Sequence, residues 1–563
     1  MVRRLATRSL PFAVIATMLA ACGGGGAGTP TPPVCEGEIE VPDPQLRDLL
    51  LSILTDPEAS EDTDTDTGGE PTLTAEALAG ITGLQAAGRD IADLRGLECA
   101  RGLVTLGLAG NKIETLAPLA SLDGLREIEL SDNPLDDLDA LASLTALEKL
   151  VLASTGITEL GFLAPLTGLR HLDLTSNEVH DLAPLARMTA LESLVLSNNK
   201  ISDASPLAGL RTLFALELDG NQLDDVAPLA GLTRLEYLDL DGNQLTTLAP
   251  LAGLKRLRDL EVSANLLTDT SGLAGKPELV ELALEGNQLA VLVDLDDLGS
   301  VTTIDLDANQ LASLDGLEKL ARLRTLSAHG NRLTDITAIA ELVDIRHLDL
   351  RDNPGLLSLA PVAGLELLDY LGAGGHQLDQ DLTPLTDLPL LRSLDLSDSG
   401  TADYAPLTSL PALRSLVLHG ARIDAAAVAE LGKLVDLTSL DLSATAVVDI
   451  SPLAPLAALT AIDCSDTGVV DLAPALAWTV VEKLKFAGTK VADISGVDAL
   501  QRLAELDLAN SAVKDLGPIV GNEYFRRGDR LDVTGTPVDV GDCPAILALR
   551  EREAVVVTDL ECE

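Results

Sequence analysis

Acidic side chains recur along the middle of the chain in a pattern that could bind cations. Between residues 215 and 307 they occupy positions two residues apart, and the same positions return every twenty-two residues. Side-by-side carboxylates attract positive charge, so this pattern predicts recognition of a basic protein, a polyamine-like ligand or a divalent cation. Ten carboxylates and one tyrosine form this acidic stripe: Glu217, Asp219, Tyr237, Asp239, Asp241, Asp259, Glu261, Glu281, Glu285, Asp305 and Asp307.

Basic and imidazole side chains occupy equivalent positions elsewhere, but their spacing argues against a metal site. They are Lys149, His171, His329, His347, Arg351, His419, Lys483 and Lys485. His329 and His347 fall in neighbouring repeats but at opposite ends of their strands, about 13 Å apart by the rise of a strand. We therefore expect solvated histidines rather than ligands of a shared metal.

The acidic run over residues 62–70 alternates aspartate and threonine, which suggests calcium binding, because alternating carboxylates can converge on a hard cation. A loop of the EF-hand type would need glycine and glutamate where this chain has Thr67 and Leu73. We interpret the run as an acidic insertion and predict no metal-binding residues in the chain.

Motifs for catalysis are missing from the sequence. It contains no G-x-S-x-G, no H-E-x-x-H, no phosphate-binding loop and no Cys/His/Asp set at a matching spacing. We predict a protein that is not an enzyme and needs no cofactor. The 88 acidic and 39 basic residues give a net charge of −49, which argues against a nucleic-acid partner, since phosphates bind the opposite sign.

A repeat of twenty-two residues positions all these side chains. Its leucine frame reads Leu169-x-x-Leu172-x-Leu174-x-x-Asn177-x-Val179, in which Leu172 and Leu174 point inward and the alternate residues point outward. The pattern resembles a leucine-rich repeat. Asparagine holds its ladder position at Asn111, Asn133, Asn177, Asn199, Asn221, Asn243, Asn265, Asn287, Asn309, Asn331 and Asn353.

The repeat predicts the architecture. Each asparagine must bond to the backbone of its own and neighbouring turns, because an unpaired buried amide is costly. The chain then returns through a short segment, often with proline as at Pro184 and Pro206, which suits a 3₁₀ or extended conformation. After Asn353 other residues replace asparagine, so we expect a weaker second half. The fold class is an α/β-type solenoid, an arc of about 21 units and roughly 100 Å with a parallel concave sheet.

The first 22 residues predict export and a lipid anchor. A basic start and an apolar run over residues 10–21 lead to Leu-Ala-Ala-Cys22, which resembles the lipobox of bacterial lipoproteins. Cys22 would then be acylated and hold the chain at a membrane surface; the alternative is an ordinary secretory signal. Gly23 after the cysteine resembles the rule for outer-membrane retention. We therefore expect a lipid-anchored protein of the bacterial cell envelope, at the outer membrane.

Composition and the cysteines define the remaining boundaries. We assign 1–21 to a signal peptide, 22–34 to a flexible tether, 35–80 to an N-terminal cap with the acidic insertion, 81–519 to the repeats, and 520–563 to the last degenerate repeat and C-terminal cap. The first cap is expected to contain an amphipathic helix, and the second a helix followed by a strand. Because cysteines bracket both caps, we predict that Cys35 pairs with Cys99 and Cys543 with Cys562, leaving Cys464 as a buried thiol.

The unit Asn199-Lys-Ile-Ser-Asp-Ala-Ser-Pro-Leu207 resembles the internalin-type repeats of bacterial surface proteins. With the lipobox and capped ends, residues 35–563 are similar to bacterial leucine-rich repeat lipoproteins. This resemblance implies the fold more than a ligand. The chain lacks the rich aromatic concave surface and the LPxTG-like tail of listeria-type internalins, so a role in host invasion is not implied.

We predict a non-enzymatic, membrane-anchored scaffold that binds a protein partner with a basic patch through its acidic concave face. One alternative is a structural or adhesive protein of the cell envelope, which could depend on cations; a divalent cation is the less favoured ligand. A second is that the stripe serves only solubility, because acidic residues are abundant throughout the chain.

Overall fold

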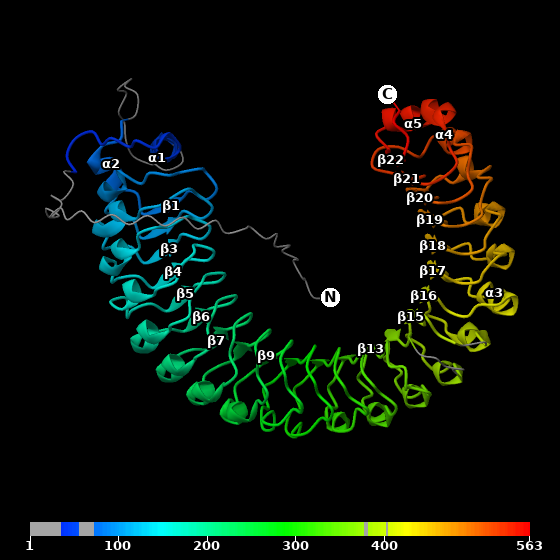
Figure 1. Cartoon of the computed structure of the whole chain (residues 1–563), viewed down its shortest axis with the longest axis horizontal. Coiled ribbons are helices and arrows are strands. Elements are labelled where there is room, and N and C mark those ends of the chain that lie inside the picture. The colour runs from blue at the N-terminus through cyan, green and yellow to red at the C-terminus, as the bar shows by residue number, and fades with distance from the viewer. Residues whose placement is uncertain (1–34, 56–71, 376–380, 401–402, 563) are drawn as a thin grey trace, which may run out of the picture.

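One coil of chain per repeat builds an open arc. The computed structural model describes residues 35–55, 72–375, 381–400 and 403–562. Strands line the inner side of the arc and short helices its outer side, and the two ends stand opposite each other (Figure 1). The predicted solenoid with a parallel concave sheet is confirmed.

Each coil contributes one short strand, which pairs in parallel with the strands before and after it in sequence. Strands form here because leucine alternates with outward residues. The strands are β1 Gly83–Gln85, β2 Thr105–Gly107, β3 Glu127–Glu129, β4 Lys149–Val151, β5 His171–Asp173, β6 Ser193–Val195, β7 Ala215–Glu217, β8 Tyr237–Asp239, β9 Asp259–Glu261, β10 Glu281–Ala283, β11 Thr303–Asp305, β12 Thr325–Ser327, β13 His347–Asp349, β14 Tyr370–Gly372, β15 Ser393–Asp395, β16 Ser415–Val417, β17 Ser439–Asp441, β18 Ala461–Asp463, β19 Lys483–Lys485, β20 Glu505–Asp507, β21 Arg530–Asp532 and β22 Val555–Val557.

The outer side is mostly 3₁₀ helix, because proline at the start of a short return favours a tight turn. The α-helices are α1 Pro44–Thr55, α2 Ala75–Ala79, α3 Ala425–Leu431, α4 Gly517–Gly521 and α5 Cys543–Glu551. The 3₁₀ helices are η1 Leu97–Cys99, η2 Ala117–Ser121, η3 Asp139–Ser143, η4 Gly161–Leu163, η5 Ala183–Arg187, η6 Ser205–Gly209, η7 Ala227–Gly231, η8 Ala249–Gly253, η9 Leu317–Lys319, η10 Thr337–Glu341, η11 Ala360–Val362, η12 Thr383–Leu385, η13 Ala405–Ser409, η14 Ser451–Leu453, η15 Ala473–Ala477, η16 Val497–Ala499 and η17 Val540–Asp542.

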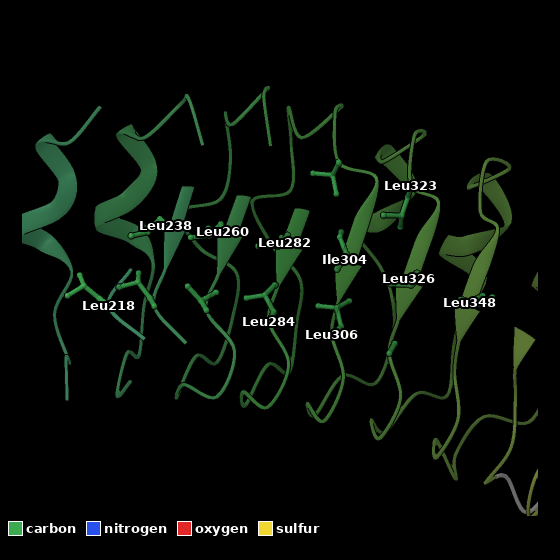
Figure 2. Close-up of a cluster of buried hydrophobic side chains, with 14 of the residues drawn as sticks. Leu218, Leu238, Leu260, Leu282, Leu284, Ile304, Leu306, Leu323, Leu326 and Leu348 are labelled. Carbon is green, nitrogen blue, oxygen red and sulfur yellow. The ribbon is translucent and has the colours of Figure 1, made fainter. Parts of the chain in front are cut away.

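The core consists of leucine columns that run from coil to coil. Leu238, Leu260 and Leu282 share one register position on β8, β9 and β10, and each is buried. Figure 2 shows this column continuing through Ile304 and Leu326. Because every inward position is filled in this way, the alternate side chains must face the concave surface.

The asparagine ladder ties neighbouring coils together as predicted. Asn199 is 7% exposed; its Nδ2 donates to Leu174 O at 2.9 Å and Leu196 O at 3.0 Å, and its Oδ1 accepts from Val179 N at 2.9 Å. Leu196 belongs to the same coil, whereas Leu174 and Val179 belong to the preceding one. Each such amide therefore bridges two coils.

Later coils use a simpler arrangement. The hydroxyl of Thr467 donates to Cys464 O at 2.6 Å, and that of Thr489 donates to Phe486 O at 2.6 Å. Both acceptors lie in the same coil as the donor. Each of these two hydroxyls thus closes its own turn, and the coils remain joined by backbone hydrogen bonds, such as that from Lys490 N to Val469 O at 2.9 Å, and by the apolar core.

Both ends of the arc carry caps stapled by disulfides. The helices α1 and α2 cover the first coil, and a disulfide joins Cys35 to Cys99. At the other end, α5 and β22 follow the last regular coil, and a disulfide joins Cys543 to Cys562. Cys464 is a free, buried thiol.

Two predicted features lie outside the described residues. They are the lipid anchor at Cys22 with its tether, and the acidic run over residues 62–70. In the part of the chain that the structure describes, no helix is long and apolar enough to cross a membrane.

A lysine interrupts the core near the middle of the arc. Lys276 stands eleven residues after Asn265, where the neighbouring units place Leu254 and Leu298. Its side chain is fully buried, and its Nζ donates to Gly272 O at 2.7 Å. No helix forms between β9 and β11 in this described stretch.

Candidate functional site

The structure brings the acidic stripe together on five adjacent strands. In β7, β8 and β9 the outward residues Glu217, Asp239 and Glu261 occupy one register position, so their side chains stand side by side. The same position continues through Ala283 to Asp305 on β11. Since strands lie about 4.8 Å apart, the stripe is a nearly continuous band of carboxylates across the concave sheet.

The centre of the stripe is the most tightly organised part. The hydroxyl of Tyr237 donates to Glu261 Oε1 at 3.1 Å, and Asp239 Oδ1 accepts from Asp241 N at 2.9 Å. Asp241 accepts in turn from the backbone N–H of Ser263 on the next coil. These bonds fix the carboxylates toward one another instead of letting them turn away into solvent.

Burial and crowding change the protonation of this centre. Burial raises the pKa of Asp239 to about 8, and the charges of Asp241, Asp219 and Glu261 add to the effect. The same causes raise the pKa of Asp241 to about 6. At neutral pH the stripe therefore holds protons that an approaching cation would displace.

Three of these carboxylates could also hold a metal ion. Asp239, Asp241 and Glu261 can each offer one oxygen, and these atoms lie within 4.8 Å of one another. Oxygen ligands of this kind suit hard cations such as Ca²⁺. The sequence analysis predicted no metal-binding residues. Among the described residues, these three carboxylates are the one group of histidine, cysteine, aspartate or glutamate side chains whose geometry could hold a metal ion.

The histidines take other partners. His329 Nε2 lies 3.4 Å from Asp352 Oδ2, whereas the ring of His347 stacks on that of Tyr370. Neither belongs to a metal-holding group in the described residues. The sequence analysis missed Tyr370, because its coil departs from the twenty-two-residue spacing. The two glycines at the outward positions that follow it, Gly372 and Gly374, could have drawn attention to this coil.

Charges of both signs lie together toward the N-terminal end. An open hollow over β3 to β6 is lined by Glu127, Glu129, Lys149, His171 and Asp173. It lies beside the stripe rather than within it. The stripe thus differs from this hollow in that its charges are all of one sign, whereas the hollow is the deeper surface with charges of both signs.

Family models match two parts of the repeat region. The model described as "Leucine-rich repeat" matches residues 101–207, and that described as "Leucine Rich repeats (2 copies)" matches residues 233–275. The coil geometry and the asparagine bridges fit these matches. The chain is a leucine-rich repeat protein.

Two solved structures share the fold, and a third is similar in sequence. The functional domain of the internalin InlJ from Listeria monocytogenes is 23% identical, with a TM-score of 0.57 over 68% of this chain and 80% of that chain. The plant peptide hormone receptor RGFR1, in complex with RGF2, is 18% identical, with a TM-score of 0.50 over 74% of this chain and 80% of the receptor chain. The internalin InlF of Listeria monocytogenes is 27% identical, with a TM-score of 0.47 over 67% and 95% of the two chains. No curated protein matches the sequence.

Leucine-rich repeat proteins are generally scaffolds that bind other proteins, and they are typically non-enzymatic. This leucine-rich repeat protein presents the open sheet surface that such binding uses. Polar groups on an open face remain in contact with water, which suits recognition better than chemistry that needs an enclosed site.

Proposed function

We propose that this protein is a recognition scaffold that binds a protein partner with a basic patch along the acidic stripe. The observation that carries the proposal is the uniform sign of the stripe: ten of fifteen outward residues over β7 to β11 are acidic and none is basic. Like charges side by side on adjacent strands destabilise a sheet. An arrangement that costs stability and raises carboxyl pKa values is explained by a cationic partner that relieves the repulsion.

The test removes charge from the centre of the stripe while keeping its shape. The triple variant Asp239→Asn, Asp241→Asn, Glu261→Gln retains side chains that can accept the hydrogen bonds of the originals. The matched control removes three exposed carboxylates from outside the stripe: Asp123→Asn, Asp224→Asn and Glu366→Gln. Each protein is immobilised and incubated with a cell-envelope extract, and bound proteins are identified by mass spectrometry.

We expect a protein with a basic patch to be recovered on the wild type and on the control, and to be lost on the stripe variant. Equal recovery on all three proteins would contradict the proposal and leave the stripe as a solubilising surface. Circular dichroism and thermal unfolding establish that each variant is folded.

A cation-dependent structural or adhesive role in the envelope is the second candidate. The observation that favours it is the trio of Asp239, Asp241 and Glu261, whose oxygens converge within 4.8 Å. In that case a chelator would release the bound material, and added Ca²⁺ would restore it. Binding to a basic partner without metal predicts the opposite response, because a divalent cation would compete for the same carboxylates.

For localisation, we propose a lipid anchor at Cys22 and a place at the outer membrane of the cell envelope. The support is the lipobox-like Leu-Ala-Ala-Cys22 after an apolar run, followed by Gly23. The substitution Cys22→Ser is expected to move the protein from the membrane fraction to the soluble fraction. Unchanged membrane association would rule out this anchor.

A further inference from the structure

One rung of the asparagine ladder is missing near the N-terminal end of the arc. Asparagine holds the ladder position in every coil from Asn111 to Asn353 except one, where Thr155 stands in the coil of β4. The Thr155 hydroxyl donates to Leu152 O at 2.8 Å and to Asn177 Oδ1 at 3.2 Å. These partners lie in its own coil and in the following one. In this described part of the arc, the threonine side chain therefore does not bridge to the coil before it.

A backbone bond between the same two coils is missing as well. In regular coils the residue after the ladder position donates to a carbonyl of the preceding coil, as Lys200 N does to Val179 O at 2.9 Å. Gly156 and Leu135 are the equivalent pair between the coils of β4 and β3, and they make no such bond in this described stretch. The N–H of Leu135 instead donates within its own coil, to Asn133 O at 3.0 Å. These two coils are consequently less closely joined than their neighbours.

A hollow of about 450 Å³ opens between these coils. Its lining residues come from the segments that join β3 to η3 and β4 to η4, so it lies on the flank of the arc, and we call it the flank hollow. Its apolar floor consists of Leu135, Leu138, Ile157 and Phe162. Leu135 and Leu138 are only partly buried, whereas Ile201, which corresponds to Leu135 in a regular coil, is fully buried. Binding sites for ligands typically enclose about 300 to 1,000 Å³.

Two glycines keep the flank hollow open. Gly156 and Gly161 both line it, and a Cβ atom at either residue would meet no other atom within 4 Å. Regular coils carry a side chain where Gly161 stands, for example Ser205 at the start of η6, and a proline at the next position, where this coil has Phe162. The open space is therefore a property of the sequence of this one coil.

The rim of the flank hollow is acidic. Asp136, Asp139 and Glu159 line it and are exposed, and none of the described residues that line it is basic. Asp136 and Asp139 belong to the first coil and Glu159 to the second, so both sides of the hollow carry negative charge. An apolar floor with a negative rim is complementary to an apolar group that stands between positive charges.

We propose that the flank hollow binds a protein segment in which an apolar side chain is flanked by lysine or arginine. The apolar side chain covers Leu135, Leu138 and Phe162 and removes their surface from water, and the basic side chains pair with the carboxylates of the rim. In an extended segment, alternate residues lie on one face about 7 Å apart, so basic residues two places before and after the apolar one can reach both sides of the hollow.

This site is separate from the acidic stripe. It lies on the flank of the arc between the coils of β3 and β4, whereas the stripe lies on the concave face and begins at β7. It also differs in chemistry, because the stripe has no apolar floor and attracts a basic partner by charge alone. The inference therefore goes beyond the proposed function and can fail independently of it.

The experiment uses the full-length protein and a photo-crosslinking peptide, acetyl-Lys-Ser-Bpa-Ser-Lys-amide, in which Bpa is the apolar photoreactive residue p-benzoylphenylalanine. A second peptide carries glutamate in place of both lysines. After illumination, trypsin cuts the chain after Arg126, Lys149 and Arg170, so that the flank hollow lies within fragments 127–149 and 150–170. Mass spectrometry then identifies the crosslinked fragments and locates the crosslinked residues within them.

Two variants test the two parts of the site. Gly161→Leu fills the flank hollow without changing its charge, and its matched control is Gly364→Leu, at an exposed glycine of another coil whose Cβ atom would also meet open space. The charge variant is Asp136→Asn, Asp139→Asn, Glu159→Gln, and its control is the variant Asp123→Asn, Asp224→Asn, Glu366→Gln already described. Thermal unfolding of each variant verifies that the fold is retained.

We expect the lysine peptide to crosslink to the residues that line the flank hollow in the wild type, and the glutamate peptide to do so at least about threefold less. The yield with the lysine peptide should fall about tenfold in Gly161→Leu, which removes the space for the apolar residue. It should fall at least about threefold in the charge variant and stay at the wild-type level in both controls.

The inference is wrong if the wild type shows no crosslinks at the flank hollow, or if Gly161→Leu is crosslinked there as strongly as Gly364→Leu. Should Gly161→Leu not fold, the charge variant decides, and an unchanged yield in that variant overturns the inference. Crosslinks confined to the strands β7 to β11 would also overturn it, while supporting the proposed function of the stripe.

Discussion

Asp239 shows how one residue links the stripe to both stability and binding. Its carboxyl is crowded by Asp241, Asp219 and Glu261, and burial raises its pKa to about 8. The folded state thus holds this proton more tightly than the unfolded chain, whose aspartates titrate near 3.9. The contribution of Asp239 to the stability of the wild type therefore falls as pH rises from about 4 to about 8.

Asp239→Asn should be as stable as the wild type at pH 4 and more stable at pH 8. We expect a gain of roughly 1 kcal/mol, well below the full cost implied by the pKa, because water still reaches the half-buried stripe. Urea unfolding at both pH values measures it, with the exposed Asp224→Asn as control. If Asp239→Asn and the wild type were equally stable at pH 8, the crowded carboxylates would not destabilise the folded state.

Lys276 offers a second test at the residue scale. Burial lowers its pKa to about 8, from the usual 10.5, and a single backbone carbonyl receives its Nζ. Because the folded state binds this proton less tightly than the unfolded chain, the destabilising contribution of Lys276 should decrease as pH increases from about 8 to 10.5.

Lys276→Met keeps the volume and removes the buried charge, so it should stabilise the protein at pH 7 by about 1 to 3 kcal/mol. The gain should shrink above pH 10. Thermal unfolding between pH 7 and pH 10.5 measures both effects. A lower melting temperature for Lys276→Met at pH 7 would mean that the charged lysine has a stabilising role.

Periodicity predicts residues such as Asp239 and Asn199 well, because their place in the coil dictates their direction. It predicts Tyr370 and Arg351 less well. Arg351 reaches a carboxylate two coils away, that of Asp395, and this contact depends on packing between coils rather than on spacing within one. The sequence analysis did not single out Lys276, although it interrupts the leucine frame.

At the scale of the repeat, the ladder residue decides whether a coil is tied to its neighbour. Asn199 bonds to the backbone of two coils, whereas Thr467 bonds only within its own. The sequence indicated a weaker second half from the loss of asparagine. The arrangement of the hydroxyls gives that prediction a physical basis, because each such coil has fewer bonds to the one before it.

Asn199→Ala should destabilise the arc more than Thr467→Ala. The first leaves Val179 N without its partner and removes the amide's bonds to Leu174 O and Leu196 O, at a cost of about 2 to 4 kcal/mol, and the second loses one hydroxyl bond worth about 1 kcal/mol. Hydrogen exchange read by mass spectrometry is the suitable measurement, since repeats can open locally. Protection from exchange should fall in two coils for Asn199→Ala and in one for Thr467→Ala. If protection fell in the same number of coils in both variants, asparagine and threonine would not differ in how they tie coils together.

The outer side was predictable where proline precedes a short return, as in η5 and η6. It was less so at α3, where the unit is two residues longer than the usual twenty-two and Asp424 caps a short α-helix by accepting from Ala427 N at 2.8 Å. Extra length in one coil lets the chain form a full helical turn. The period alone does not specify how that length is used.

For the whole molecule, the question is whether net charge or local charge attracts a partner. The chain carries −49 in total, so a basic protein is drawn toward it from every side. Salt at about 0.1 M, however, screens charges that lie more than about 10 Å apart. The attraction that a bound partner feels is therefore set by the carboxylates nearest to it. An arc that gathers ten carboxylates on its inner face can therefore act differently from a chain with the same charge spread evenly.

Affinity for decalysine should fall roughly tenfold or more between about 0.05 and 0.5 M NaCl. In the stripe variant Asp239→Asn, Asp241→Asn, Glu261→Gln this dependence should be shallower, because fewer charges face the peptide. The control Asp123→Asn, Asp224→Asn, Glu366→Gln replaces the same number of carboxylates, changes the net charge at least as much because Asp239 is largely protonated at neutral pH, and should retain the wild-type dependence. Titrations at several salt concentrations separate the two cases. If both variants flatten the dependence equally, total charge rather than the concave stripe attracts the peptide.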